Sequence, residues 1–272
     1  MKIIFSRKGF DSSTGGIPNP ILPDGTLLSL PIPSSRDGVR YGELSYDGMS
    51  YYDIIHAIAP KRQIQASSTC HLDPDLRKGV LPREKWIPAF GQAGSSLSHL
   101  FNQGVGVGDL FLFFGWYRKT ELHNGVLRFV PNAPDLHIIY GYLQVGSIIR
   151  QKEDLPEELM THPHAADFRW ETKRNALFIP TEKLSLDSSL PGYGCLNYSP
   201  KRILTKRGCK RRIWDLPQFF RDIDISYNHS AWKDDGFHSA GRGQEFVCEA
   251  NDKAIEWVKE IILSRNTPGK TS

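Results

Sequence analysis

The fold is decided by one stretch, Gly108-Asp109-Leu110-Phe111-Leu112-Phe113-Phe114-Gly115-Trp116-Tyr117-Arg118. Its apolar residues follow one another without polar alternation, so a strand formed here is buried on both faces. We therefore expect a central strand over 105–117, started by the Gly108-Asp109 turn. Residues 136–149 form a second strand segment, in which Gly141 predicts a bulge or a sharp bend.

The composition is that of a globular protein with many turns. The chain has 272 residues, of which 39% are hydrophobic and 24% charged, with 24 glycines and 18 prolines. These counts favour short elements and an α+β fold over a helical bundle. We predict one compact unit over 1–272: a central curved, mainly antiparallel sheet, flanked by short helices and a C-terminal helix over 251–264. We expect residues 265–272 to form a frayed tail.

Several protein classes are disfavoured by simple counts. The four cysteines contain no Cys-x-x-Cys pair, so reduced thiols are expected rather than disulfides or a zinc knuckle. The first residues become polar by Ser6, too early for a signal peptide. No run approaches the roughly 20 apolar residues that span a bilayer. We expect a cytoplasmic protein without membrane contact.

Positive charge is concentrated in one segment, although the net charge is only +4. The basic residues of this segment are Lys201, Arg202, Lys206, Arg207, Lys210, Arg211 and Arg212. Contacts to phosphates give sequence-independent affinity, so this run, close to Trp214 and Tyr198, predicts a nucleic-acid surface. The alternative is a solvated basic loop.

The segment from Cys70 to Arg118 also carries candidate metal ligands. His71-x-Asp73 is similar to the first two ligands of a facial iron triad, which a distant histidine completes. His99, His162 and His164 are available for that role, and a divalent metal is the one cofactor these residues suggest. Asp73 and Asp75 would face the same way in an extended strand. The alternative is a structural turn in which either aspartate binds backbone amides.

Acid–base chemistry needs no metal. Asp11, His71 and Asp73 are candidates for a base and the group that orients it, and Lys8 or Arg118 for stabilising an oxyanion or phosphate. Lys8 is also a candidate amine nucleophile. The alternatives are a surface lysine at position 8 and a turn capped by Asp11. The full catalytic set that we predict is Lys8, Asp11, His71, Asp73, Asp75 and His99.

Other residues are candidates for binding the substrate. Gln92 and Gln244 carry amides that can bind the edge of a base. Arg242 stands between two glycines, and its guanidinium can donate paired hydrogen bonds to a phosphate. Backbone-bonding amides and a tight turn are the alternatives. The full substrate-binding set is Gln92, Trp116, Arg118, Arg242, Gln244 and Glu245. We expect the site where Lys8, Asp11, His71, Asp73, Gln92 and Arg242 converge.

The order of these segments resembles a known family, the nucleotide modification associated domain 3. The matching stretches are Phe5–Ser12, Pro20–Pro33, Cys70–Leu76, Gly108–Trp116 and Ser239–Val247. The resemblance implies an association with phage and bacterial systems that modify bases in DNA, and partners among the proteins of such systems. It implies no particular reaction.

A shorter likeness covers 107–149, which is similar to PUA-like barrels, including readers of modified bases; a barrel-like core over 105–150 would follow. Two functions therefore stay open. One is an enzyme acting on a nucleotide or on a base in DNA, and the other is a non-catalytic module that reads a base. A purely structural subunit of a modification complex is a third.

Overall fold

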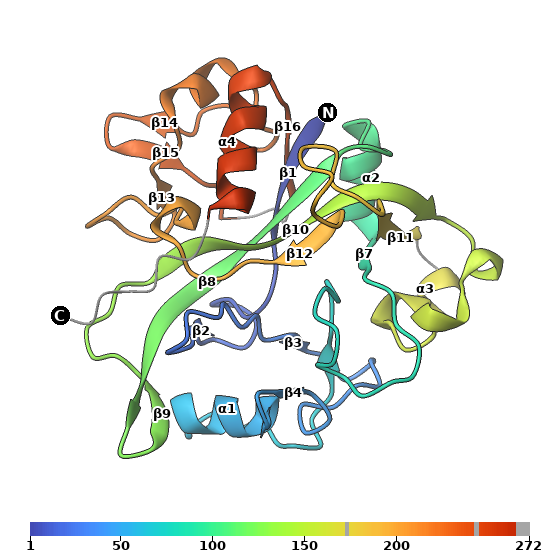
Figure 1. The fold of residues 1–272 in the computed structure, drawn as a ribbon, viewed down its shortest axis with the longest axis vertical. Helices are drawn as coiled ribbons and strands as arrows, with labels where there is room; N and C mark the ends of the chain where they lie inside the picture. The colour runs from blue at the N-terminus through green and yellow to red at the C-terminus, as the bar shows by residue number, and fades with distance from the viewer. Residues whose placement is uncertain (172–173, 242–244, 265–272) are drawn as a thin grey trace.

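Two long strands form the centre of the molecule (Figure 1). The computed structural model describes residues 1–171, 174–241 and 245–264. Strand β8 (Leu110–His123) pairs antiparallel with β10 (Leu136–Ile149). Their register shifts between Ile139 and Gly141, which confirms the bulge expected at that glycine.

The main sheet is mixed. Its hydrogen-bonded order is β16-β1-β8-β10-β11-β7, with β2 and β9 on β8 and β12 on β10. Strands β1 and β2 run parallel to β8, and the other six pairings are antiparallel. The remaining bounds are β1 (Lys2–Arg7), β2 (Asn19–Ile21), β7 (Phe90–Ala93), β9 (Val126–Phe129), β11 (Asn175–Pro180), β12 (Tyr193–Cys195) and β16 (Glu245–Glu249).

The sheet curls until its terminal strands approach each other. Gln92 on β7 donates from Nε2 to Oε1 of Glu245 on β16 over 2.6 Å, although these strands stand at opposite ends of the sheet order. The result is a half-barrel with few helices, which confirms the expected α+β class with a curved, mainly antiparallel sheet. A PUA-like core over 105–150 stays a prediction.

Both faces of β8 are buried over its first six residues, Leu110–Gly115, as the unbroken apolar run predicts. Phe111 and Phe113 point into the curl, where their ring centroids lie 4.9 and 5.2 Å from that of Phe90. Phe114 points to the other face and contacts Trp214 at 5.0 Å. Full burial of each such ring contributes roughly 1.5–3 kcal/mol. The rings on the two faces of β8 therefore anchor one packed layer on each side of the strand.

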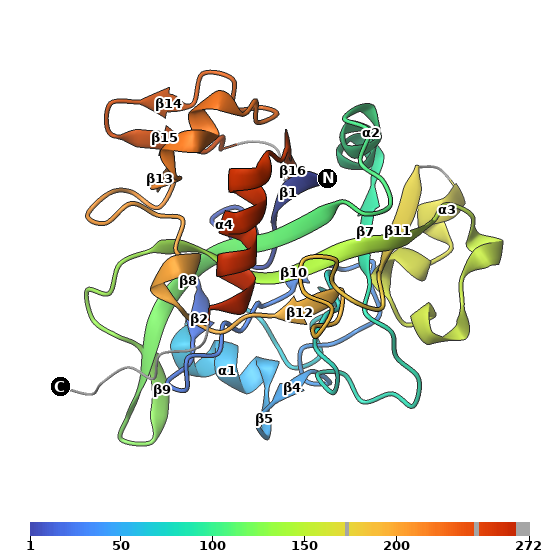
Figure 2. The ribbon, with the colours of Figure 1, turned by 45° about the horizontal axis from the view of Figure 1, so that its top comes forward.

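The outer layer on the Phe114 side comes from the C-terminal part of the chain. It contains α4 (Asp252–Leu263) and a small sheet of β13 (Ile213–Trp214), β15 (Gly236–His238) and β14 (Trp232–Lys233). Helix α4 begins at Asn251, whose side chain accepts from the amide of Ala254 over 2.9 Å. The expected C-terminal helix is therefore present and capped by Asn251. Figure 2 shows α4 over the central strands and α1 on the opposite side.

Short elements complete the fold. The α-helices are α1 (Tyr51–Ile58), α2 (Gly94–Asn102) and α3 (Phe168–Glu171). The short strand pairs are β3 (Ile32–Pro33) with β6 (Cys70–His71) and β4 (Ser45–Tyr46) with β5 (Met49–Ser50). The 3-10 turns are η1 (Lys152–Asp154), η2 (Glu157–Leu159), η3 (Pro163–Ala165), η4 (Pro200–Arg202) and η5 (Gln218–Asp222).

Two further observations bear on the sequence-based expectations. All four cysteines are unpaired, and burial raises the pKa of the Cys70 and Cys248 thiols to about 12. Among the helices that the structure describes, none is both long and apolar enough to cross a bilayer. The expected frayed tail, residues 265–272, lies outside the described residues.

Candidate active site

His71 and Asp73 lie beside the end of the curled sheet. Strand β6 places His71 by pairing it with Ile32. The Asp73 carboxylate then reaches β7, where Oδ1 accepts from the amide of Gly91 over 2.6 Å. Because Oδ1 is held there, Oδ2 is the oxygen that lies 4.0 Å from Nε2 of His71.

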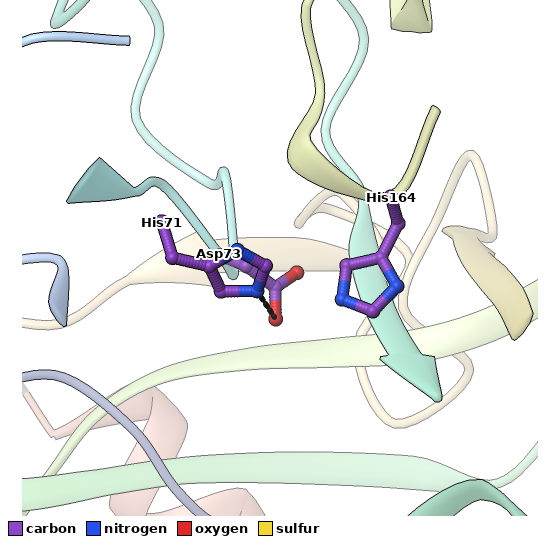
Figure 3. Close-up of side chains that lie close together, drawn as sticks. All are labelled: His71, Asp73 and His164. Carbon is purple, nitrogen blue, oxygen red and sulfur yellow. Dashed lines mark ion pairs between the residues drawn. The ribbon is translucent and has the colours of Figure 1, made fainter. Parts of the chain in front are cut away.

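His164 joins them from η3. Its Nδ1 lies 2.6 Å from Oδ1 of Asn175, and Nδ2 of Asn175 donates to the His164 carbonyl over 2.9 Å. The second bond fixes the Asn175 amide, so its Oδ1 accepts and Nδ1 of His164 carries the proton. Nε2 of His164 therefore keeps its lone pair, and Figure 3 shows one ring nitrogen of His164 on the side of Asp73.

Gly91 makes room for this histidine. A Cβ atom at position 91 would lie 2.2 Å from Cγ of His164, closer than any real side-chain contact. Donor atoms of His71, Asp73 and His164 all lie within 4.8 Å of one another. We call His71, Asp73, His162, His164 and Asp37 the histidine–carboxylate cluster.

Two cluster members orient the others. Nδ1 of His71 lies 2.8 Å from Oδ2 of Asp37, and Arg169 donates to Oδ1 of Asp37 over 3.1 Å. Nδ1 of His162 accepts from the amide of His164 over 3.2 Å, and Nε2 of His162 lies 3.3 Å from Oδ1 of Asp73. Asp37 thus orients His71, and His162 lies against both His164 and Asp73.

A second group of polar residues borders the cluster. Lys8 is the residue directly after β1. Its Nζ lies 3.3 Å from Oε1 of Glu245 and 4.4 Å from the Phe90 ring centroid. The same Oε1 accepts from Gln92 and lies 3.4 Å from Oγ of Ser6. We call Lys8, Gln92 and Glu245 the lysine–glutamate arm.

The pKa shifts agree with this arrangement. Burial would raise the pKa of Asp73, but the hydrogen bond from His162 and the charges of His164 and Lys8 lower it overall. Burial also opposes ionisation of Asp37, yet hydrogen bonds from His71, Ser34 and Arg169 lower its pKa to about 2. Burial lowers the pKa of His164 to about 3 against the opposing charge of Asp73. At neutral pH both carboxylates are charged and His164 is neutral.

Part of the predicted convergence is therefore observed. His71 lies 4.0 Å from Asp73, Lys8 and Gln92 share Oε1 of Glu245, and Lys8 is near enough for its charge to lower the pKa of Asp73. Asp11 does not join them: its Oδ1 accepts from the amides of Ser13 and Thr14 over 2.8 and 2.7 Å, which is the turn-capping alternative. Arg242 and Gln244 lie outside the described residues.

Three other candidates have partners of their own. Asp75 is buried and paired with Arg83, so the expectation that it faces the same way as Asp73 is wrong. Nε2 of His99 lies 2.9 Å from Oγ of Ser226. Arg118 pairs with Asp135 over 2.7 Å on the half-exposed part of β8. None of these side chains is part of the cluster, because each is held by a neighbour elsewhere in the fold.

Most of the basic run lines an open groove of about 1030 Å³. The basic groove, as we call it, is lined by Lys206, Arg207, Lys210, Arg211, Arg212, Arg7 and Trp116, among others. The guanidinium of Arg211 lies 4.1 Å over the Trp116 ring and donates to Oγ of Ser12 over 2.6 Å. Asp11 and Asp135 also line it, so it holds more cations than carboxylates.

Two members of the basic run do not belong to this groove. Arg202 is 3% exposed and donates to the carbonyls of Asn197, Ile261, Ile262 and Ser264. It completes the end of α4 instead of offering its charge to a ligand, so the expectation that it contacts nucleic acid is wrong. Lys201 is exposed and pairs with Glu260 over 3.2 Å.

Asp37, Arg169 and Asn175 were missed by sequence reasoning. Asp37 stands in a polar turn, and Asn175 at the start of a short strand, and neither setting signals a site. His162 and His164 were recognised as available ligands because of their His-x-His spacing. The missed residues act through contacts between distant segments, which no local pattern reveals.

The geometry can now be set beside known proteins. A sequence model of the family described as nucleotide modification associated domain 3 matches residues 2–249. The chain belongs to this family. Comparison with curated proteins and with solved structures finds no match. The family match confirms the resemblance read from the sequence, and its description links this domain to the modification of nucleotides.

Proposed function

We propose that this protein is an enzyme that modifies a nucleotide or a base in DNA, with its reaction centre at the histidine–carboxylate cluster and the lysine–glutamate arm. One observation carries the proposal: ionisable side chains from five distant segments gather where β7 and β16 approach each other. The side chains of Asp37, Asp73 and Glu245 are only 1–2% exposed, whereas His71 is 14% exposed and Lys8 10%. A buried, internally oriented set with two reachable members suits catalysis better than structure alone.

The roles follow from the contacts. His71 is oriented by Asp37 through Nδ1, so its Nε2 is the atom we assign to proton transfer. Lys8, held between Glu245 and the Phe90 ring, supplies positive charge where an oxyanion or a phosphate would develop. Gln92 holds Glu245 in place through its Nε2.

We assign the basic groove to the phosphates of the substrate. Arg7 lines the groove while its neighbour Lys8 belongs to the lysine–glutamate arm, so the two sites flank the same end of β1. Enzymes that act on a base in DNA take it out of the stack while the backbone stays bound outside. A nucleotide held by its phosphates in the groove would present its base around the end of β1.

A non-catalytic reader is the second candidate. The contact of Arg211 with Trp116 favours it, because a cation and an aromatic ring in a groove bind single-stranded nucleic acid without chemistry. A reader needs the groove but no oriented acid and base.

Mass spectrometry of nucleosides separates the two functions. DNA and free nucleotides are recovered from cells that express the wild type, Lys8→Met, or the control Lys183→Met, whose lysine is exposed. We expect a nucleoside of altered mass with the wild type and the control, and none with Lys8→Met. An unchanged nucleoside profile with the wild type, together with salt-dependent DNA binding by the purified protein, would establish the reader instead.

A further inference from the structure

The three residues at the centre of the cluster each leave one lone pair directed at the others. His71 commits Nδ1 to Asp37, Asp73 commits Oδ1 to Gly91, and His164 commits Nδ1 to Asn175. What remains is Nε2 of each histidine and Oδ2 of the aspartate. One donor atom of each residue lies within 4.8 Å of those of the other two, and Nε2 of His71 lies 4.0 Å from Oδ2 of Asp73.

We propose that His71, Asp73 and His164 bind a divalent first-row transition metal ion through these atoms. Two imidazole nitrogens and one carboxylate oxygen suit zinc, iron(II) or manganese(II) better than magnesium or calcium, which prefer oxygen alone. Three protein ligands leave positions open for water and substrate, as in catalytic sites.

The surroundings are those of a built metal site. Metal-binding histidines usually donate their second ring nitrogen to a carboxylate or a carbonyl oxygen, which fixes the tautomer and the ring orientation. Asp37 does this for His71, and the amide oxygen of Asn175 does it for His164. A hydrogen-bonded Asp73 is likewise held in one orientation by Gly91.

Charge and size agree with a cation. Three carboxylates (Asp37, Asp73 and Glu245) face two cationic side chains (Lys8 and Arg169), which leaves one negative charge in excess. Adjacent ligands of an ion with bonds of about 2.1 Å lie about 3 Å apart. Metal binding would therefore draw Nε2 of His71 and Oδ2 of Asp73, which lie 4.0 Å apart, together by roughly 1 Å.

The proposal deepens the proposed function, since it gives the same site a cofactor, but its test does not depend on any reaction. The purified full-length protein is stripped with a chelator and titrated with Co²⁺, whose visible absorption reports its ligands. We expect one equivalent to bind to the wild type. His164→Ala should weaken Co²⁺ binding by at least 100-fold, and Asn175→Ala, which removes only the orienting oxygen, by about 10- to 100-fold. Zn²⁺ should displace Co²⁺ in competition, whereas Fe²⁺ should do so only in large excess.

Two controls keep the outcome interpretable. His99→Ala removes a half-buried histidine outside the cluster and should bind Co²⁺ like the wild type. Circular dichroism shows whether each variant folds. If His164→Ala does not fold, His71→Gln, which replaces the most exposed ligand, is tested in its place. Equal Co²⁺ affinity in the wild type, His71→Gln and a folded His164→Ala would overturn the proposal. Metal binding without any altered nucleoside would leave the metal site standing and refute the enzyme.

Discussion

The histidine–carboxylate cluster and the basic groove are assembled in opposite ways. The cluster draws its residues from positions 37 to 164, and each is largely buried and oriented by a partner. The groove takes five of its cations from the seven residues 206–212 and leaves them open to solvent in a cavity of about 1030 Å³. The first arrangement fixes geometry, as chemistry on a substrate requires, and the second supplies charge that adapts to a flexible chain.

Arg202 shows that two residues adjacent in sequence can lie in different settings, one buried and oriented by partners and the other open to solvent. It stands beside Lys201 in the basic run, yet it is buried and bonded to four carbonyls. We expect Arg202→Ala to lower the free energy of unfolding by roughly 3 kcal/mol, because buried carbonyls lose a charged donor. Lys201→Ala should change it by less than about 0.5 kcal/mol. Urea denaturation of both variants measures the difference, and equal stabilities would show that Arg202 is not a structural residue.

Gly91 tests how far the cluster depends on exact packing. In Gly91→Ala the new methyl group would overlap His164, whose ring must move. We expect modification of nucleosides to fall by about 10- to 100-fold, as small displacements at reaction centres cost rates of this size. Gly106→Ala is the matched control, since a Cβ there meets no atom within 4 Å. Activity of Gly91→Ala at the level of the control would mean that the position of His164 is unimportant.

The basic groove should respond to charge rather than to shape. Reversal of two groove charges in Arg211→Glu/Arg212→Glu should weaken DNA binding about tenfold or more and reduce the salt slope by about 2, one for each lost phosphate contact. Fluorescence anisotropy at several salt concentrations measures both quantities. Lys78→Glu/Lys183→Glu makes the same change at two exposed lysines outside the groove. If both pairs behave alike, the groove is not the contact surface.

His137, which lines the groove, offers a smaller test through stability. Burial lowers its pKa from 6.5 to about 3, with the charges of Arg7 and Arg211 adding to the effect, and its Nδ1 accepts from Nε1 of Trp214. The unfolded state then binds the proton more tightly, so stability is full above pH 6.5 and falls as the pH drops towards 3. Between pH 6 and 4 the wild type should lose roughly 1.4 kcal/mol per pH unit more than His137→Gln. Parallel curves for the two proteins would contradict this assignment.

Much of the fold was predictable because it rests on local patterns. The unbroken apolar run 110–114, the glycine at 141 and the cap at Asn251 each indicate a structure that the coordinates show. The apolar residues of 27–32, which follow the turn at 23–26, also favour a strand. Of these residues only Ile32 lies in one (β3), and the Leu30 amide donates to Oδ1 of Asn19 instead of a neighbouring strand. A side-chain partner eleven residues away leaves no trace in the strand's own pattern.

The candidate site was only half predictable for the same reason. His71-x-Asp73 and the basic run are contiguous motifs and were recognised. Asp37 and Asn175 became visible only once the chain had folded, because each acts on a histidine from another segment. The spacing of Asp73 and Asp75 likewise could not show that the Asp75 carboxylate pairs with Arg83 and not with the partners of Asp73.

The central claim is that the cluster performs the chemistry and the groove only binds. The most direct test measures the altered nucleoside by mass spectrometry as the concentration of enzyme rises, for His71→Ala and for Arg211→Glu/Arg212→Glu. The account predicts that raising the concentration restores the product for the groove variant and never for His71→Ala. Product formation by His71→Ala at the wild-type rate would contradict it.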